Sequence, residues 1–436
     1  MKKPLCVVSC PLDTFSGYGA RSRDLLKSLI ELKDSEWDIK ILSQRWGDTP
    51  FGFYPENNPI KNRFIPTINQ KPDVWIQITV PNEFQPVGNY NIGISAGIET
   101  TAYPGEFLEG MNRMDLNLVS SEHSKRVALS SKYDKIEEKT NQKVGTIQCT
   151  KPVEVLFEGL DLNKYFKIQN PKSTLLKDIP EDFCFLYTGH WLPGNFGEDR
   201  KNTATLIKTF LETFNTPSKK KPALILKSNR VNYSLLDREQ IIELIHKIKD
   251  KYGSKNSANI YLLHGEMTDD EMNQLNNDNK VKAFVSFTKG EGFGRPLLEG
   301  AITGKPTIVS NWSGHVDFIK PDYNILIGGE LKNVHESSAN QFLLKESQWF
   351  NINTDIASKA MKDVFKNYKR YWESSRKQTQ YLKNNWSLNK MKSVLGDFLE
   401  KIPIQQAVEL KLPKLKNLPK LGENKPEFPK LKKIEI

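Results

Sequence analysis

The chain has 436 residues, of which 38% are hydrophobic and 10% aromatic, so it can fill more than one hydrophobic core. No stretch approaches the roughly 20 consecutive apolar residues that cross a bilayer, so the sequence predicts no membrane-spanning helix. The four cysteines show no C-x-x-C spacing, which argues against a zinc site and a disulfide framework and favours a cytoplasmic enzyme.

The formal net charge of +11 is partly local. Residues 411–436 hold eight lysines and three glutamates, so this tail contributes +5 and the rest of the chain +6. A surplus of that size on a body this large is typical of a solvated surface. It would also suit the binding of diphosphates, anionic lipid or DNA.

Short apolar runs separated by helical or loop segments mark the first half of the chain. The predicted strands are Leu5–Ser9, Trp37–Leu42, Asp73–Thr79, Tyr90–Ala96, Leu116–Ser121 and Val153–Glu158. This alternation favours a parallel, doubly wound sheet, in which ligands bind beyond the carboxyl ends of the strands. Glu99 follows the fourth strand and is a candidate general base, although it could equally be a carboxylate that starts a helix.

A loop with two glycines, Gly17 and Gly19, follows the first predicted strand. The full G-x-G-x-x-G motif of a dinucleotide fold is absent, because Ser22 occupies the third glycine position. The pair is therefore compatible with a tight turn as well as with a phosphate-facing loop.

The second half repeats the architecture of the first. Residues 169–182 lose periodicity and gain proline and charge, which predicts an interdomain linker. Thr268 and Glu271 predict a capping box at the start of one helix. The predicted strands are Cys184–Gly189, Ala223–Lys227, Ile260–His264, Ala283–Thr288, Thr307–Ser310 and Asn324–Ile327.

Residues 281–311 predict a strand, a glycine-rich loop, a helix and a further strand. Gly290, Gly292 and Gly294 let the backbone approach a ligand, and Pro296 suits the first position of a helix. A helix that starts behind such a loop favours an anion, because its first N–H groups and its dipole point toward the ligand.

Two carboxylates flank this predicted anion site, Glu291 in the loop and Glu299 in the helix. A simple phosphate pocket gains nothing from two neighbouring anions, whereas a sugar nucleotide has hydroxyls that need acceptors on both sides of its diphosphate. Glu299 alone could merely complement the helix dipole, but that explanation does not extend to Glu291 within a glycine loop.

The segment 291–315, EGFGRPLLEGAITGKPTIVSNWSGH, resembles the donor-site signature of the retaining GT-B glycosyltransferases of the glycogen-synthase-like group, family 4. The resemblance implies two Rossmann-like α/β domains, each with a doubly wound parallel sheet, that face each other across a cleft. It also implies that Glu291 meets the transferred sugar, together with the backbone of Gly292, Phe293 and Gly294, and that Glu299 binds the ribose hydroxyls.

The same resemblance places cations and glycines around the donor diphosphate. Arg200 and Lys201 match an arginine-lysine pair that neutralises the diphosphate, whereas His190 stands where relatives carry a further arginine. The helix start at Pro296–Leu298 also faces the leaving group. Further donor candidates are Gly17 and Gly19 in the first loop, Lys227 at a strand end, and Arg295, which would contact phosphate or pair with Glu291.

The predicted domains follow from these elements. They are a Rossmann-like acceptor domain (1–168), a linker (169–182), a Rossmann-like donor domain (183–375), a helix that crosses back to the first domain (376–402), and a basic Pro/Lys/Leu tail (403–436). Residues 355–386 are expected to be helical. The tail is either a flexible appendage or a segment that docks a partner or an anionic polymer.

The expected reaction is transfer of a sugar from a nucleoside-diphosphate sugar, UDP- or GDP-linked, to an acceptor hydroxyl. The resemblance implies retention of the anomeric configuration, no cofactor and no metal. The acceptor is left open among glycan, lipid and modified nucleic acid. Two alternatives remain at this point: a transferase directed to DNA or another polyanion, and a non-catalytic protein that binds sugar nucleotides or nucleic acid.

Overall fold

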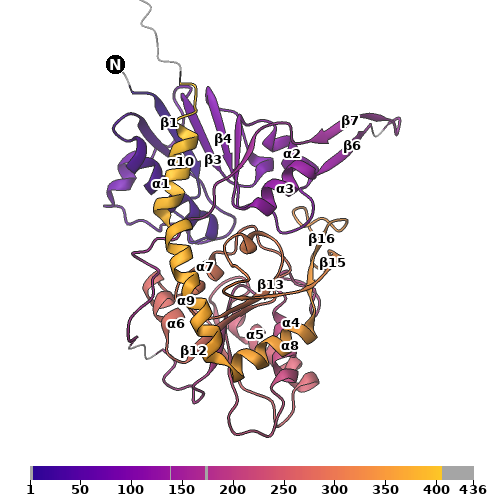
Figure 1. Cartoon of the computed structure of the whole chain (residues 1–436). Helices are drawn as coiled ribbons and strands as arrows, with labels where there is room; N and C mark the ends of the chain where they lie inside the picture. Colours follow the sequence, from indigo (N-terminus) through magenta and orange to yellow (C-terminus); the bar gives the residue numbers. More distant parts are fainter. Residues whose placement is uncertain (1–2, 138, 172–174, 405–436) are drawn as a thin grey trace, which may run out of the picture. The chain divides into compact units, whose positions relative to one another are not determined.

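The computed structural model describes residues 3–137, 139–171 and 175–404 (Figure 1). The first sheet has six parallel strands in the order β2-β1-β3-β4-β5-β8. Their bounds are β1 (Leu5–Cys10), β2 (Asp38–Ser43), β3 (Val74–Ile78), β4 (Tyr90–Ile94), β5 (Leu116–Val119) and β8 (Val153–Val155).

Helices cover both faces of this sheet, as Figure 1 shows. Helix α1 (Gly17–Lys33) packs Leu25, Leu26 and Leu29 on one face. Helices α2 (Gly105–Met111) and α3 (Glu122–Ser130) pack on the other face. The sheet is therefore doubly wound, as its sequence pattern predicts.

The second sheet also has six parallel strands, in the order β11-β10-β9-β12-β13-β14. The strands are β9 (Cys184–Thr188), β10 (Ala223–Lys227), β11 (Ile260–Leu263), β12 (Val281–Ser286), β13 (Thr307–Ser310) and β14 (Ile325–Ile327). The helices are α4 (Thr203–Thr213), α5 (Leu235–Tyr252), α6 (Asp269–Asn277), α7 (Arg295–Ala301) and α8 (Thr354–Lys366).

The predicted strands are all present, with ends that differ by three residues or fewer. The capping box is also confirmed, because Thr268 and Glu271 bond each other's backbone N–H groups at the start of α6. Two antiparallel hairpins were not predicted, and their strands are β6 (Lys132–Ile136), β7 (Lys143–Gln148), β15 (Gly329–Asn333) and β16 (Gln348–Ile352). Strands β6, β7 and β15 are mostly exposed, so they lack the apolar pattern that marks a buried strand.

The expected helix over residues 355–386 is interrupted. Helix α8 ends at Lys366, and α9 (Tyr368–Asn385) begins after Asn367. A second break at Trp386 and Ser387 separates α9 from α10 (Leu388–Leu399), whose N-cap is Ser387. Helix α10 lies against α1 of the first sheet (Figure 1). Apart from Pro403 and Ile404, the predicted tail lies outside the described residues.

Gly17 and Gly19 lie within a helix and not in the loop that the sequence suggests. Helix α1 begins at Gly17, and the side chain of its N-cap, Ser16, accepts a hydrogen bond from the Gly19 N–H group (2.9 Å). A Cβ atom on Gly19 would overlap the backbone of Thr14, whereas one on Gly17 would meet nothing within 4 Å. Gly19 therefore allows close packing against the loop that precedes the helix, whereas Gly17 has no close neighbour.

Each sheet has a point where its strand order reverses, and ligands of open α/β sheets bind beyond the strand ends at such points. In the second sheet this point lies between β9 and β12. The loops that leave these two strands are residues 189–202 and 287–294, which contain Arg200, Lys201 and Glu291. The topology thus gathers the predicted catalytic residues of the second half at one place.

The glycine loop after β12 packs directly on the loop after β4 of the first sheet. A Cβ atom on Gly290 would overlap the carbonyl oxygen of Glu99, and one on Gly292 would overlap that of Ala96. The Ser120 hydroxyl links the same two loops, with its oxygen 2.5 Å from the carbonyl oxygen of Ala96 and 3.0 Å from that of Gly292. In this structure, two of the glycines thus permit close approach of another backbone segment.

We predict that Gly292→Ala lowers the free energy of unfolding by about 1–3 kcal/mol, because a methyl group there must displace the backbone at Ala96. Urea denaturation would measure the change. Gly328→Ala is the matched control, since a Cβ atom on Gly328 meets nothing within 4 Å. Equal stability of the two variants would contradict the packing described for the glycine loop.

Candidate functional site

The carboxylate of Glu291 lies between two cations. Lys201 Nζ is 2.6 Å from one carboxylate oxygen, and Arg200 Nη1 is 3.3 Å from the other. Arg200 also donates to the carbonyl oxygen of Gly290 (2.8 Å) and lies 3.5 Å from the carboxylate of Glu99. The structure therefore brings together the four residues predicted to be catalytic, and Glu99 reaches them from the first half of the chain.

The two cations determine the protonation state of Glu291. Burial alone would raise its pKa, but the positive charges of Lys201 and Arg200 outweigh burial and hold the pKa at about 2. The carboxylate is thus ionised at neutral pH and acts only as an acceptor. Its own backbone N–H group donates to the Ser313 hydroxyl (2.9 Å), which fixes the loop from a third side.

A second ionic cluster surrounds Arg295 at the start of α7. Its guanidinium lies 2.7 Å from the carboxylate of Asp24, 3.6 Å from that of Glu158 and 3.0 Å from that of Glu299. The predicted pairing of Arg295 with Glu291 is wrong, because these three carboxylates hold the arginine and Glu291 has its own two cations. Arg295 instead links α7 to the first half of the chain.

Glu299 differs from Glu291 in its ionisation. Burial raises the pKa of Glu299 to about 7, and the nearby Arg295 counteracts only part of this rise. The Arg295 guanidinium is shared among three carboxylates, of which Glu158 also pairs with Arg21 (3.4 Å), whereas the single carboxylate of Glu291 contacts two cations. The two glutamates of the predicted signature therefore lie in opposite electrostatic environments.

Several predicted donor-binding residues make contacts within the protein that leave them less available to a ligand. The side chains of Phe293 and Leu298 are buried in the hydrophobic core, so only their backbones could meet a ligand. Pro296 has no N–H group, and the N–H groups of Leu297 and Leu298 are 2.9 Å and 3.3 Å from the carbonyl oxygen of Gly294. The start of α7 is thus a weaker anion site in this structure than the sequence suggests.

His190 and Lys227 flank the first cluster without joining it. His190 lies at the surface, and partial desolvation, followed by the charges of Lys201 and Arg200, lowers the pKa of its ring, which favours the neutral form at pH 7. His190 therefore does not replace the positive charge of an arginine at that position. The ammonium group of Lys227 donates to the Gly265 carbonyl oxygen, and burial lowers its pKa.

Sequence reasoning missed residues that hold the loops and helix of the site in place. Tyr18 accepts a hydrogen bond from the Ala96 N–H group (3.0 Å), and Ser120 bridges Ala96 and Gly292. Asp24 is the nearest carboxylate to Arg295. Tyr18 stands between two glycines, which could have drawn attention to it. The partners across the two halves depend on tertiary contacts, and no local pattern signals them.

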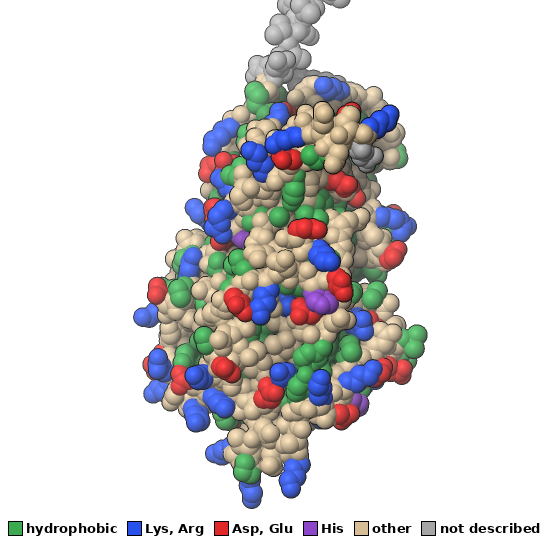
Figure 2. Space-filling view, turned by 90° about the vertical axis from the view of Figure 1, so that its right-hand side faces the viewer, with side chains coloured by type: hydrophobic (Ala, Val, Ile, Leu, Met, Phe, Trp, Pro, Cys, Tyr) green, Lys and Arg blue, Asp and Glu red, His purple; other side chains and the backbone are tan. Residues whose placement is uncertain are grey.

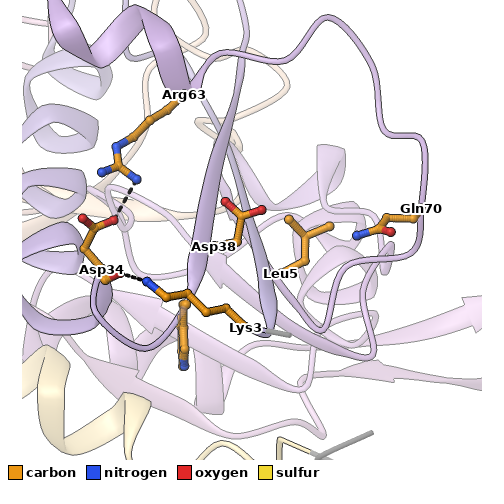
Figure 3. A pocket seen from close by; sticks show the side chains of 7 residues that line it. Lys3, Leu5, Asp34, Asp38, Arg63 and Gln70 are labelled. Atoms are coloured by element: carbon orange, nitrogen blue, oxygen red, sulfur yellow. Dashed lines mark hydrogen bonds and ion pairs between the residues drawn. The ribbon is translucent and has the colours of Figure 1, made fainter. Parts of the chain in front are cut away.

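A pocket of about 360 Å³ lies elsewhere (Figure 3). Its walls include Lys3, Leu5 and Asp34, so it is near the amino end of β1, whereas the glycine loop follows the carboxyl end of β12. Within the described residues, no group of three or more His, Cys, Asp or Glu side chains could hold a metal ion. None of the described helices is both long enough and apolar enough to span a membrane.

Comparisons with known proteins give a fold-level match. No family model matches the sequence, and no curated protein matches it. Sucrose-phosphate synthase from Thermosynechococcus elongatus matches with a TM-score of 0.57 at 9% identity, over 92% of this chain and 99% of that one. Anabaena HepE, in complex with UDP-glucose, matches with a TM-score of 0.58 at 12% identity, over 91% and 99%.

A glycosyltransferase from Rickettsia africae matches similarly, with a TM-score of 0.55 at 14% identity over 92% of this chain and 99% of that one. The two six-stranded parallel sheets and these matches agree. The chain has the GT-B fold. At such low identities the similarity establishes the GT-B architecture, and the chemistry has to be argued from the site.

We predict that Glu299 makes stability depend on pH. The folded chain keeps a proton on Glu299 up to about pH 7, whereas the unfolded chain releases it near the ordinary value of 4.5. Unfolding therefore releases a proton in this window, and this contribution to stability falls as pH rises from about 5 to 7. Glu299→Gln should gain up to about 3 kcal/mol relative to the unmodified chain between pH 5 and pH 8.

Urea denaturation at a series of pH values would measure this difference. Glu330→Gln, at an exposed position in β15, is the control for loss of a carboxylate from the surface. Stability curves of Glu299→Gln and the unmodified chain that stay parallel across the window would contradict the raised pKa.

Proposed function

We propose that this protein is a glycosyltransferase that moves a sugar from a nucleoside-diphosphate sugar to an acceptor hydroxyl, with retention of configuration and without a metal. The observation that carries the proposal is the ionised Glu291 between Lys201 and Arg200 at the strand-order reversal of the second sheet. The structural match to HepE in complex with UDP-glucose supports a nucleotide-sugar donor.

The cations are suited to the leaving group. A nucleoside diphosphate gains negative charge as its bond to the sugar breaks, and cations fixed in advance stabilise that charge in the transition state. The described cluster of Glu99, Arg200, Lys201 and Glu291 is balanced, with two positive and two negative side chains. A bound diphosphate would compete with Glu291 for Lys201, which would free a carboxylate oxygen to accept from a sugar hydroxyl.

Glu299 is assigned to the ribose of the donor. An ionised carboxylate accepts two hydrogen bonds from neighbouring hydroxyls better than a neutral carboxyl group does. With a pKa of about 7, Glu299 is ionised in only part of the molecules at neutral pH. Binding of the ribose hydroxyls would favour the ionised form and lower this pKa, since they donate to the carboxylate.

Retention does not require a protein nucleophile in this scheme. The ion pairs with Lys201 and Arg200 outweigh burial and keep the pKa of Glu291 well below its usual range, which makes this carboxylate a poor nucleophile or base. The acceptor oxygen attacks the anomeric carbon on the face that the diphosphate leaves, and the proton of the acceptor passes to a departing phosphate oxygen. Glu99 remains the alternative general base, because it is partly exposed beside Arg200.

The face of the molecule drawn in Figure 2 bears on the alternative of a polyanionic acceptor. Figure 2 shows Lys and Arg side chains interspersed with Asp and Glu side chains on the face that it presents. Proteins that bind DNA use cations gathered into a patch or a stripe. This face therefore gives no support to a transferase directed to DNA.

A donor panel tests the proposal. Release of nucleoside diphosphate from UDP-, GDP- and ADP-sugars would be measured with and without EDTA, alongside the shift in melting temperature that each free nucleotide causes. We expect hydrolysis of one donor class that EDTA leaves unchanged. Lys201→Ala should lower turnover by about 100-fold or more, since a transition-state contact of this kind contributes several kcal/mol.

A binding variant and a surface control complement Lys201→Ala in that panel. Glu299→Ala should abolish the melting shift by the cognate nucleotide, whereas Lys247→Ala, in a surface pair with Glu243 on α5, should change neither readout. A melting shift without turnover would establish nucleotide binding, and turnover would then have to be measured with an acceptor present. Full turnover in both Lys201→Ala and Glu299→Ala would show that the site is wrongly placed.

A further inference from the structure

Aromatic side chains gather where the first two strands of the first sheet end. They come from the loop after β1, the first turn of α1 and the segment after β2. The members of this aromatic platform are Phe15, Tyr18, Trp46, Phe51, Phe53 and Tyr54. Sequence analysis missed the platform because its parts are separated by the whole of α1 and β2.

Five of the six rings form two contacting groups. Phe53 lies between Phe15 and Tyr54, with ring centroids 5.2 Å apart in both pairs. Tyr18 stacks on Trp46 with centroids 4.0 Å apart and an angle of 26° between the planes. Phe15 and Phe51 keep 45% and 42% of their surface exposed, so both rings are accessible to a ligand.

A buried carboxylate holds the segment after β2 in place. Asp13 is fully buried, and its side chain accepts from the Tyr54 N–H group and from Lys61 Nζ, both at 2.8 Å. Its backbone carbonyl oxygen accepts from Gly52 (2.9 Å) and Phe53 (3.0 Å). The rings are therefore presented on a fixed backbone, so little ordering is needed when a ligand binds.

One member of the platform, Tyr18, is linked to the candidate site through the backbone of Ala96. The Tyr18 hydroxyl accepts from the N–H group of Ala96, and the carbonyl oxygen of Ala96 is the group that leaves no room for a side chain at Gly292. Tyr18 thus contacts the Ala96 loop of the first half of the chain, and this loop in turn packs on the loop that carries Glu291.

We propose that the aromatic platform is the acceptor subsite and that its ligand is a saccharide. The faces of aromatic rings carry partial negative charge, and they attract the C–H groups that a sugar ring presents on its apolar face. This inference rests on the proposed function, because the acceptor of a glycosyltransferase must reach the anomeric carbon of the donor. Phe15 and Phe51 contribute the exposed rings, and Asp13 is a positioning residue.

Charge favours a saccharide over a single-stranded nucleic acid, whose bases also stack on aromatic rings. A nucleic acid needs a surplus of cations for its phosphates. The charges near the platform are balanced: the cations are Arg23, Arg45 and Lys61, and the anions are Asp13 and Glu56, which pair with Lys61, and Asp24, whose charge acts on Tyr54. Two of the cations are engaged by rings, Arg23 over Phe53 (3.6 Å) and Arg45 over Phe51 (5.2 Å).

The test is glycan-array binding by the fluorescently labelled full chain in the presence of UDP. We expect the unmodified chain to bind at least one class of oligosaccharide, and Phe15→Ala/Phe51→Ala to bind it more weakly by about tenfold or more. Phe51→Leu keeps apolar surface but removes the ring, so it should also weaken binding. Phe166→Ala, at another exposed aromatic position, is the matched control and should bind normally.

Further readouts separate the possible failures. The melting shift caused by UDP reports the donor site, so it should be unchanged in the Phe15→Ala/Phe51→Ala variant. If UDP caused no melting shift in the unmodified chain, that result would count against the proposed donor and not against the platform. Three results would overturn the saccharide subsite. They are no glycan binding by the unmodified chain, equal binding by the unmodified chain and the double variant, and ring-dependent binding of a 20-nucleotide oligo-dT strand in place of glycans.

Discussion

The pairing of Glu291 with Lys201 and Arg200 is the interaction on which the account of this molecule depends. A carboxylate buried in a loop is unfavourable unless cations face it, and the two cations come from a loop that is distant in sequence. The parallel sheet makes this pairing possible, because β9 and β12 are neighbours whose following loops diverge at the same edge. The close packing of the same glycine loop on Ala96 and Glu99 joins the two halves of the chain at this point.

The two ionic clusters show that the number of neighbouring cations affects whether a buried glutamate is ionised. Glu291 has two cations and stays ionised, whereas Glu299 shares Arg295 with Asp24 and Glu158 and titrates near neutrality. A permanently charged acceptor suits a site that must hold a sugar hydroxyl at any physiological pH. Glu299 combines two roles, since it faces the proposed ribose site and belongs to the contact between the halves.

The sequence predicted the parts of the molecule that local pattern determines. Apolar runs marked the strands, Thr268 and Glu271 marked a capping box, and the glycine loop marked the position of Glu291. It could not predict the partner of Arg295, because Asp24 and Glu158 approach it only after folding. The same limit explains why the aromatic platform was missed. The helix break at Asn367 was also missed, because no proline or glycine interrupts the helical pattern there.

A crystal structure of the protein with bound UDP tests the central claim most directly. The account predicts a diphosphate within hydrogen-bonding distance of Lys201 and Arg200, and a ribose whose hydroxyls contact the carboxylate of Glu299. It also predicts that Lys201 moves toward the phosphates and away from Glu291. A nucleotide bound elsewhere, for example in the pocket beside Lys3 and Asp34, with the Glu291 ion pairs unchanged, would contradict the account.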